Sequence, residues 1–334
     1  MRTLLKNFAA ALLVRCGGAA ARKGRAIVLP AAVLVTVLLV LGGCGGAGSA
    51  AATGGKLNVV AAEDFWGSIA EGVGGDRVVV TDVITNPAAD PHDYEPTADD
   101  GRALASAQVS IVNGIGYDEW AAKLLAANED GGRVEVSVGD VLGLRSGDNP
   151  HQWYSPRSVE RVTAAIVKAY EEADPGHDSY YEAQAKKFDA RGLARYHQLI
   201  AQIKGEFAGT KVGASESIFE PLAPALGLDL ITPAGFMDGI AEGTEPSPSE
   251  KATADHQLAD RAVSLWVYNS QNATPDVKRL NEAAEANGIP IATVTETLTP
   301  EGASFQAWMV RELEGIQSAL RAAGGAGGGS TGTG

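Results

Sequence analysis

The sequence predicts an α/β protein with two (β/α) lobes, each built on a parallel sheet, and a ligand site in the cleft between them. Three observations lead to this fold class. Eight short strand-like segments alternate with helix-like segments, which is the pattern of parallel α/β sheets. One helical stretch, residues 177–207, far exceeds the usual ~11–12 residues and separates four strands from four. The length of 334 residues suits two domains.

The N-terminal 43 residues are predicted to be a signal peptide rather than part of the fold. Basic residues precede the apolar run 26–41, and no acidic residue occurs before Glu63, as in a secretory signal. The run is shorter than the roughly 20 residues of a membrane-spanning helix. It ends in Leu41-Gly42-Gly43-Cys44, which resembles a bacterial lipobox and implies cleavage before Cys44 and a lipid on its thiol. The alternative is an uncleaved signal anchor with an incidental cysteine.

Charge and cysteine content limit the possible ligands. The chain has a formal net charge of −14, and removing residues 1–43, with six basic and no acidic residues, leaves −20. Such a charge disfavours nucleic acid and anionic membranes and is compatible with a cationic ligand. Cys16 lies within the signal and Cys44 carries the predicted lipid. The folded part is therefore predicted to have neither a disulfide nor a thiolate metal ligand.

The first lobe is assigned to residues 57–176, after a flexible tether at 44–56 that is rich in Gly and Ala. Ser155-Pro156 predicts a helix start, with Ser as N-cap and Pro at the first helical position. Thr97 begins a weaker capping signal. The predicted strands are 57–62, 77–84, 108–112 and 133–138, and the predicted helices include 63–73, 98–107, 117–127 and 157–173.

Residues 177–207 are predicted to form one long, rigid helix that joins the lobes. The stretch has a helical pattern and no interior proline. Gly192 inside it costs roughly 1 kcal/mol relative to Ala and is a candidate site for a bend. The alternative is a helix hairpin within a single domain.

The second lobe is assigned to residues 208–322, followed by a disordered Gly-rich tail at 323–334. Ser247-Pro248-Ser249-Glu250 combines a capping box with Pro at the first helical position. The predicted strands are 210–214, 228–231, 263–268 and 290–294, and the last helix is predicted at 305–321.

Two of the five histidines are candidate metal ligands. His92 and His151 each follow a proline, in loops after the carboxyl ends of first-lobe strands, where open α/β sheets bind ligands. Proline fixes φ and so helps to hold an imidazole in place. Their separation of 59 residues has no motif value by itself. His177, His197 and His256 are predicted to be surface or packing residues.

Two carboxylates occupy matching places in the second lobe. Glu216 directly follows strand 210–214, and Glu296 directly follows strand 290–294. Together with the two histidines they would complete a shell of two nitrogen and two carboxylate ligands. The alternative is that each glutamate is an acid near a helix start, favoured by the helix dipole.

Four segments carry a resemblance to a known family. DPHDYEPT (90–97), NPHQWYSP (149–156), VGASESIFEPLAPALGL (212–228) and VTETLTPEGASFQAWM (294–309) resemble the metal-binding lipoproteins of bacterial zinc/manganese ABC importers. The similarity runs from about Leu57 to Leu320. It implies two (β/α) lobes joined by one long helix, with the metal in the cleft. It also implies four ligands, at His92, His151, Glu216 and Glu296.

The resemblance leaves the choice of metal open. The family's third ligand is His in typical zinc proteins and Glu in manganese or iron proteins, and here it is Glu216. The fourth is usually Asp, and Glu296, one methylene longer, departs from that pattern, which leaves its mode of coordination open. Zn²⁺ or Mn²⁺ is expected before Fe²⁺, and the Irving–Williams order favours zinc over manganese at such a site. Asp93, Glu95 and Tyr268 are candidates to orient the imidazoles of the two histidines.

The predicted function is an extracytoplasmic solute-binding protein, not an enzyme. It would capture a divalent transition metal and deliver it to an ABC permease and its ATPase. The protein would be a monomer, lipid-anchored at the extracytoplasmic face of the cell membrane, and would bind no nucleic acid. One alternative is a metal-dependent hydrolase, although four protein ligands without an evident base, and the absence of HExxH and GxSxG, disfavour it. Another is an adhesin that uses the same fold.

Overall fold

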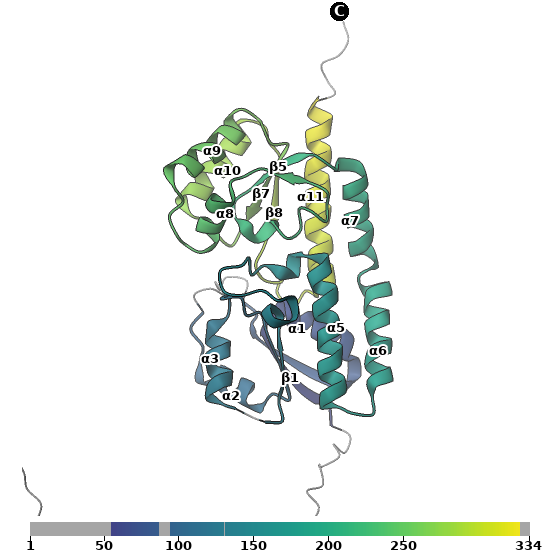
Figure 1. Cartoon of the computed structure of the whole chain (residues 1–334). Helices are drawn as coiled ribbons and strands as arrows, with labels where there is room; N and C mark the ends of the chain where they lie inside the picture. The colour runs from purple at the N-terminus through teal and green to yellow at the C-terminus, as the bar shows by residue number, and fades with distance from the viewer. Residues whose placement is uncertain (1–54, 87–93, 130, 328–334) are drawn as a thin grey trace, which may run out of the picture. The chain divides into compact units, whose positions relative to one another are not determined.

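The computed structural model describes residues 55–86, 94–129 and 131–327, and within them the first lobe contains a four-stranded parallel sheet (Figure 1). The strand order is β2-β1-β3-β4. Strand β2 pairs with one edge of β1 and strand β3 with the other, so the topological switch point lies between β1 and β3. Ligands of open sheets bind at the carboxyl ends of strands at such a switch point. The strands are β1 (Leu57–Glu63), β2 (Val78–Ile84), β3 (Val109–Val112) and β4 (Val134–Ser137).

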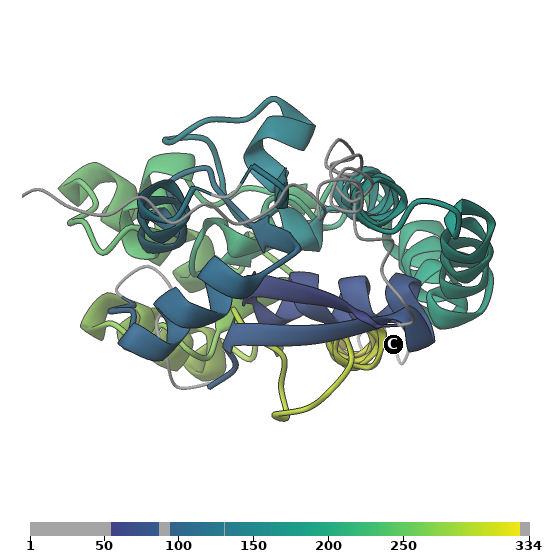
Figure 2. The same ribbon diagram turned by 90° about the horizontal axis from the view of Figure 1, so that it is seen from below.

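Helices cover both faces of this sheet. Val59 and Ala61 of β1 belong to one buried cluster with α1 and α5, whereas Val60 and Ala62 belong to another with α2 and α3. Successive strand residues point to opposite faces, so a strand buried on both sides is apolar throughout. Figure 2 shows the sheet edge-on in part, with helices on either side. The helices are α1 (Asp64–Gly74), α2 (Ala98–Ser106), α3 (Glu119–Ala127), α4 (Val138–Leu142) and α5 (Pro156–Ala173).

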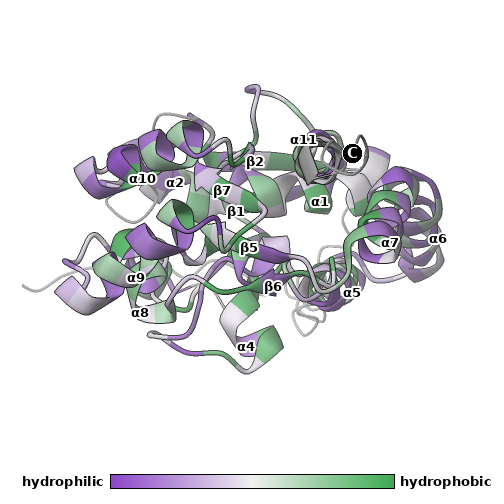
Figure 3. Cartoon of the chain, turned by 90° about the horizontal axis from the view of Figure 1, so that it is seen from above, coloured by the Kyte–Doolittle hydropathy of each residue, from purple (hydrophilic) through white to green (hydrophobic). Residues whose placement is uncertain are grey.

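The second lobe repeats this arrangement. Its parallel strands lie in the order β6-β5-β7-β8, with the switch between β5 and β7. In Figure 3, hydrophilic residues are prominent on α9 and α10, while Val277, Leu280 and Ala284 of α10 are buried. The elements are β5 (Lys211–Ala214), β6 (Asp229–Leu230), β7 (Leu265–Asn269), β8 (Ile291–Val294), α8 (Ala234–Ala241), α9 (Pro248–Ala259), α10 (Pro275–Ala286) and α11 (Phe305–Gly327).

The structure confirms the two-lobed α/β fold and the predicted helix starts. Ser155 caps α5 by accepting from Ser158 N, with Pro156 at the first helical position. Thr97 and Ser247 each form a complete capping box. Among the described residues, no helix combines the length and the apolar character needed to cross a bilayer. The last helix α11 runs past its predicted end at 321 to Gly327. Residues 1–54, with the predicted signal and Cys44, lie outside the described residues.

The segment that joins the lobes differs from a single continuous helix. Helix α6 (Asp178–Lys187) is followed by a π-helical turn, Phe188–Gly192, and then by α7 (Ala194–Phe207). Leu193 N donates to Phe188 O at 2.8 Å, the i→i+5 bond of a π-turn. The buried ring of Phe188 lies against Gly72 of α1 and against Gly192, where an added Cβ would meet it at 2.7 and 3.2 Å. The interruption at the predicted bend therefore coincides with the docking of Phe188 onto α1.

Replacing Gly72 by alanine is expected to destabilise the protein by about 1–3 kcal/mol, because the new methyl group would overlap the Phe188 ring. The gain in helix propensity, at most about 1 kcal/mol, does not offset this. Gly205→Ala in α7 is the matched control, because a Cβ there meets nothing within 4 Å. It should stabilise the fold by about 0.5–1 kcal/mol. Urea unfolding of both variants measures the difference, and equal stabilisation would contradict the proposed docking.

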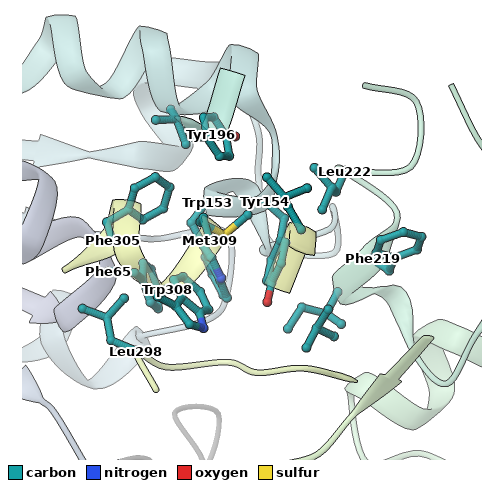
Figure 4. Close-up of a cluster of buried hydrophobic side chains, with 14 of the residues drawn as sticks. Phe65, Trp153, Tyr154, Tyr196, Phe219, Leu222, Leu298, Phe305, Trp308 and Met309 are labelled. Atoms are coloured by element: carbon teal, nitrogen blue, oxygen red, sulfur yellow. The ribbon is translucent and has the colours of Figure 1, made fainter. Parts of the chain in front are cut away.

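A continuous apolar core connects the lobes. Phe65 of α1 stacks on Trp153 with ring centroids 3.9 Å apart, and Tyr154 meets Trp308 of α11 edge-on at 5.6 Å (Figure 4). Helix α11 packs along α7 and β8 and also contacts α1. Phe305 N at the start of α11 donates to Ser68 Oγ of α1 at 2.8 Å. The C-terminal helix is therefore a second element, beside α6 and α7, that ties the two lobes together.

Candidate metal centre

Three of the four predicted ligands meet in the structure. One nitrogen of His151 and one carboxylate oxygen each of Glu216 and Glu296 lie within 4.8 Å of one another, and all three residues are buried. Glu216 lies two residues after β5 and Glu296 two residues after β8, both at the carboxyl ends of their strands. His151 comes from the first lobe, just before the 3-10 turn Gln152–Tyr154. His92 lies among residues 87–93, outside the described residues.

The spacing of these atoms suits one metal ion. His151 Nε2 lies 3.5 Å from Glu296 Oε1. Two ligands that each lie about 2.1 Å from a tetrahedral ion are about 3.4 Å apart. The His151–Glu296 pair is therefore already at ligand spacing, and Glu216 offers an oxygen within 4.8 Å of both.

Amide and hydroxyl donors hold both carboxylates in place. Asn269 Nδ2 bridges them, donating to Glu216 Oε1 and, at 3.0 Å, to Glu296 Oε1. Asn272 Nδ2 donates to Glu216 Oε2 at 2.7 Å, and Tyr117 OH of the first lobe donates to Glu296 Oε2 at 2.9 Å. A carboxylate oxygen accepts at more than one lone-pair position, so these bonds leave room for a metal ion.

Burial sets the charge state of the group. Burial, and after it the neighbouring charge of Glu296, raises the pKa of Glu216 to about 8. Burial lowers the pKa of His151 to about 4. At neutral pH the ion-free site therefore holds a neutral imidazole and a Glu216 carboxyl that keeps its proton. A divalent cation would replace that proton and remove the repulsion between the carboxylates.

A further buried carboxyl, that of Glu312, supports the loop that carries Glu296. Glu312 of α11 accepts from Tyr154 OH at 2.6 Å and from Thr295 N at 2.9 Å. Trp308 Nε1 donates to Thr295 Oγ1 at 2.8 Å. Despite these bonds, burial raises the pKa of Glu312 to about 8. The network fixes Thr295, the residue before Glu296, to both α11 and the first lobe.

A polar cavity opens beside the candidate ligand His151. It has a volume of about 600 Å³, and its lining includes His151, Asn149 and three acidic residues of the second lobe, Glu220, Asp238 and Glu242. Burial raises the pKa values of Glu220 and Asp238 above the usual range. Acidic walls of this kind attract cations.

Two of the three predicted supporting residues are among the described residues. Glu95 is exposed, and Tyr268 is half-buried against the core, while Asp93 is outside the described residues. Asn269, the next residue of β7, contacts both carboxylates instead, because successive strand residues point to opposite faces. The sequence NSQN, residues 269–272, stands at the same sheet edge as Glu216 and Glu296, which is the signal that could have identified it.

The three remaining histidines have other surroundings, as predicted. His177 Nδ1 lies 2.9 Å from Asp174 Oδ1 near the start of α6, and His197 Nε2 lies 3.1 Å from Asp189 Oδ1. His256 is exposed on α9.

Comparison with known proteins agrees with this geometry. The family described as "Zinc-uptake complex component A periplasmic" matches residues 59–319. The manganese-binding lipoprotein MntA of Halalkalibacterium halodurans is 30% identical over 181 residues, which cover 52% of this chain and 59% of that relative. The metal ABC transporter substrate-binding lipoprotein SloC of Streptococcus mutans is 24% identical over 286 residues, covering 79% of this chain and 90% of SloC.

A solved structure has the same fold. The Mn-bound periplasmic metal binding protein of Candidatus Liberibacter asiaticus, in a serine-to-alanine mutant form, superposes with a TM-score of 0.68 at 21% identity. The superposition covers 79% of this chain and all of the other. Since the family match extends over both sheets and over the three predicted ligands that the structure describes, the chain belongs to the family of periplasmic zinc-uptake component A proteins.

Proposed function

We propose that this protein captures a divalent transition metal ion outside the cytoplasmic membrane and delivers it to an ABC permease and its ATPase. The observation that carries the proposal is the buried group of His151, Glu216 and Glu296 between the two lobes. A nitrogen and carboxylate set of this kind suits Zn²⁺, Mn²⁺ and Fe²⁺. The names of the relatives MntA and SloC support the same class of cargo.

We propose His92 as the fourth ligand, on the sequence context DPHDYEPT. With it the site would have four protein ligands and no position reserved for a reactive water, which favours binding over hydrolysis. Because the two glutamates can each offer one or two oxygens, Mn²⁺ could be accommodated with more ligand atoms than Zn²⁺.

We further propose that the lipid on Cys44 keeps the protein beside its transporter. The relatives MntA and SloC are named as lipoproteins, and the lipobox-like sequence before Cys44 supports the same anchor here. Two acyl chains on one cysteine would hold a monomer firmly at the membrane.

The test is metal binding by the mature chain after exhaustive chelation. We expect about one Zn²⁺ or Mn²⁺ per chain by calorimetric titration, and the same metal in protein isolated from its native host by elemental analysis. Competition between the two ions ranks them. Failure to bind either ion, or turnover of ester and phosphoester substrates by the metal-loaded protein, would overturn the proposal.

A further inference from the structure

The side chain of Asn149 joins the histidine ligand to the opposite lobe. Its Oδ1 lies 3.0 Å from His151 N and 2.9 Å from His151 Nδ1. Its Nδ2 donates to Ser217 O at 2.8 Å and to Glu220 Oε2 at 2.9 Å. Ser217 directly follows Glu216, so one amide group connects a first-lobe ligand to the segment that carries a second-lobe ligand.

The partners of Asn149 fix which way its amide points. The backbone N–H of His151 can only donate, so the atom facing it must be Oδ1. The carbonyl of Ser217 can only accept, so the atom facing it must be Nδ2. Two unambiguous partners therefore assign both ends of the amide.

This orientation also assigns the tautomer of His151. Since Oδ1 is only an acceptor, the neutral imidazole must carry its proton on Nδ1 to bond with it. The lone pair is then on Nε2, the atom 3.5 Å from Glu296 Oε1. Metal-bound histidines characteristically donate their other N–H to such an acceptor, which orients the ring.

The loop around Asn149 is itself held at several points. Gln152 Nε2 donates to Asn149 O at 2.8 Å, and Ser158 Oγ donates to Gln152 Oε1 at 2.9 Å. Asn113 Nδ2 donates to Pro150 O at 3.0 Å. The backbone of this loop is therefore anchored by side chains of the first lobe.

We propose that Asn149 is a positioning residue with two roles: it selects the Nδ1–H tautomer that presents Nε2 of His151 to the metal, and it locks this geometry to the second lobe at Ser217. The effect on metal affinity rests on the proposed function, whereas the effect on the tautomer does not. Without the amide, the imidazole can populate both neutral tautomers and rotate, and either change withdraws the lone pair from the site.

Asn149→Ala removes both roles and Asn149→Asp removes one. The aspartate keeps an acceptor for His151 but has no N–H for Ser217 O, and it places a charge beside Glu220. Asn287→Ala is the matched control, because the Asn287 amide donates to a helix carbonyl, Ala283 O, at the end of α10.

The first measurement is the ¹⁵N spectrum of His151 in ion-free protein at pH 7. We expect wild type, Asn149→Asp and Asn287→Ala to show one protonated nitrogen, Nδ1, and Asn149→Ala to show a mixture of tautomers. The second is the Zn²⁺ affinity, which should fall roughly 10–100-fold in Asn149→Ala, with partial recovery in Asn149→Asp. Unfolding curves accompany both, and the isosteric Asn149→Asp decides the tautomer assignment if the alanine variant does not fold.

The outcomes distinguish a failure of the proposed metal-binding function from a failure of the positioning role of Asn149. If wild type binds neither Zn²⁺ nor Mn²⁺, the proposed function fails, and the spectra still decide the tautomer. If wild type binds and Asn149→Ala retains both its affinity and the single Nδ1–H signal, the positioning role is wrong. If Asn149→Asp carries its proton on Nε2, the acceptor role is wrong.

Discussion

Replacing His151 by alanine is expected to abolish tight metal binding. The residue is the proposed nitrogen ligand, with Nε2 3.5 Å from Glu296 Oε1, and no other histidine of the described residues lies in the group. The loss should exceed the roughly 10–100-fold that removal of an outer-shell partner costs. Calorimetric titration with Zn²⁺ and Mn²⁺ measures it, and unfolding curves establish that the variant is folded.

Two further histidine variants serve as comparisons for His151→Ala. His256→Ala, on the exposed surface of α9, should bind as wild type does. His92→Ala should lose affinity to a similar extent as His151→Ala if His92 is the fourth ligand. Retention of wild-type affinity in His151→Ala would remove the metal site from this position, whereas retention in His92→Ala alone would leave a three-residue site.

Replacing Glu216 by glutamine is expected to have two effects with a common cause. Metal affinity should fall steeply, because a carboxylate ligand becomes a neutral amide. In the ion-free protein, the free energy of unfolding should become less dependent on pH. Both effects follow from the position of this carboxyl. It is buried beside Glu296, and its pKa is raised to about 8.

The sign of the pH effect follows from proton linkage. An unfolded chain loses the proton of this carboxyl near its ordinary pKa of 4.5, whereas the ion-free native state keeps it to about pH 8. Between these values the native state binds more protons, so raising the pH destabilises it, by at most about 1.4 kcal/mol per pH unit for one proton. The stabilisation of the native state by this protonated carboxyl is fully present below pH 4.5 and is lost as the pH passes 8.

Urea unfolding of ion-free wild type and Glu216→Gln at pH 5, 6, 7 and 8 measures this slope. Asp64, Asp82 and Glu312 also have pKa values raised by burial, to about 7, 8 and 8, so both proteins should lose stability as the pH rises. The difference between the two slopes isolates Glu216. Glu285→Gln, at an exposed position of α10, controls for the loss of one charge. Identical slopes in wild type and Glu216→Gln would show that Glu216 is ionised in the ion-free site.

The sequence by itself determined the elements of this fold. All eight predicted strands are present with bounds within two residues, because buried parallel strands form short β-branched runs that are visible locally. The starts of α5 and α9 were likewise readable, since the Ser–Pro cap and the capping box act within four residues. His151, Glu216 and Glu296 were predicted as ligands because each stands just beyond a strand or in a proline-flanked loop.

Only the tertiary structure decided how those ligands are held. Asn269, Tyr117 and Asn149 reach their partners across 27 to 179 residues of sequence or across the two lobes. Likewise, Phe188 meets Gly72 of a distant helix where the joining helix becomes a π-turn. Local patterns specify backbone geometry and burial, but a hydrogen bond between distant side chains depends on where two whole lobes place them. The sequence therefore predicted the candidate ligands, and the packing of the lobes determined which distant side chains surround them.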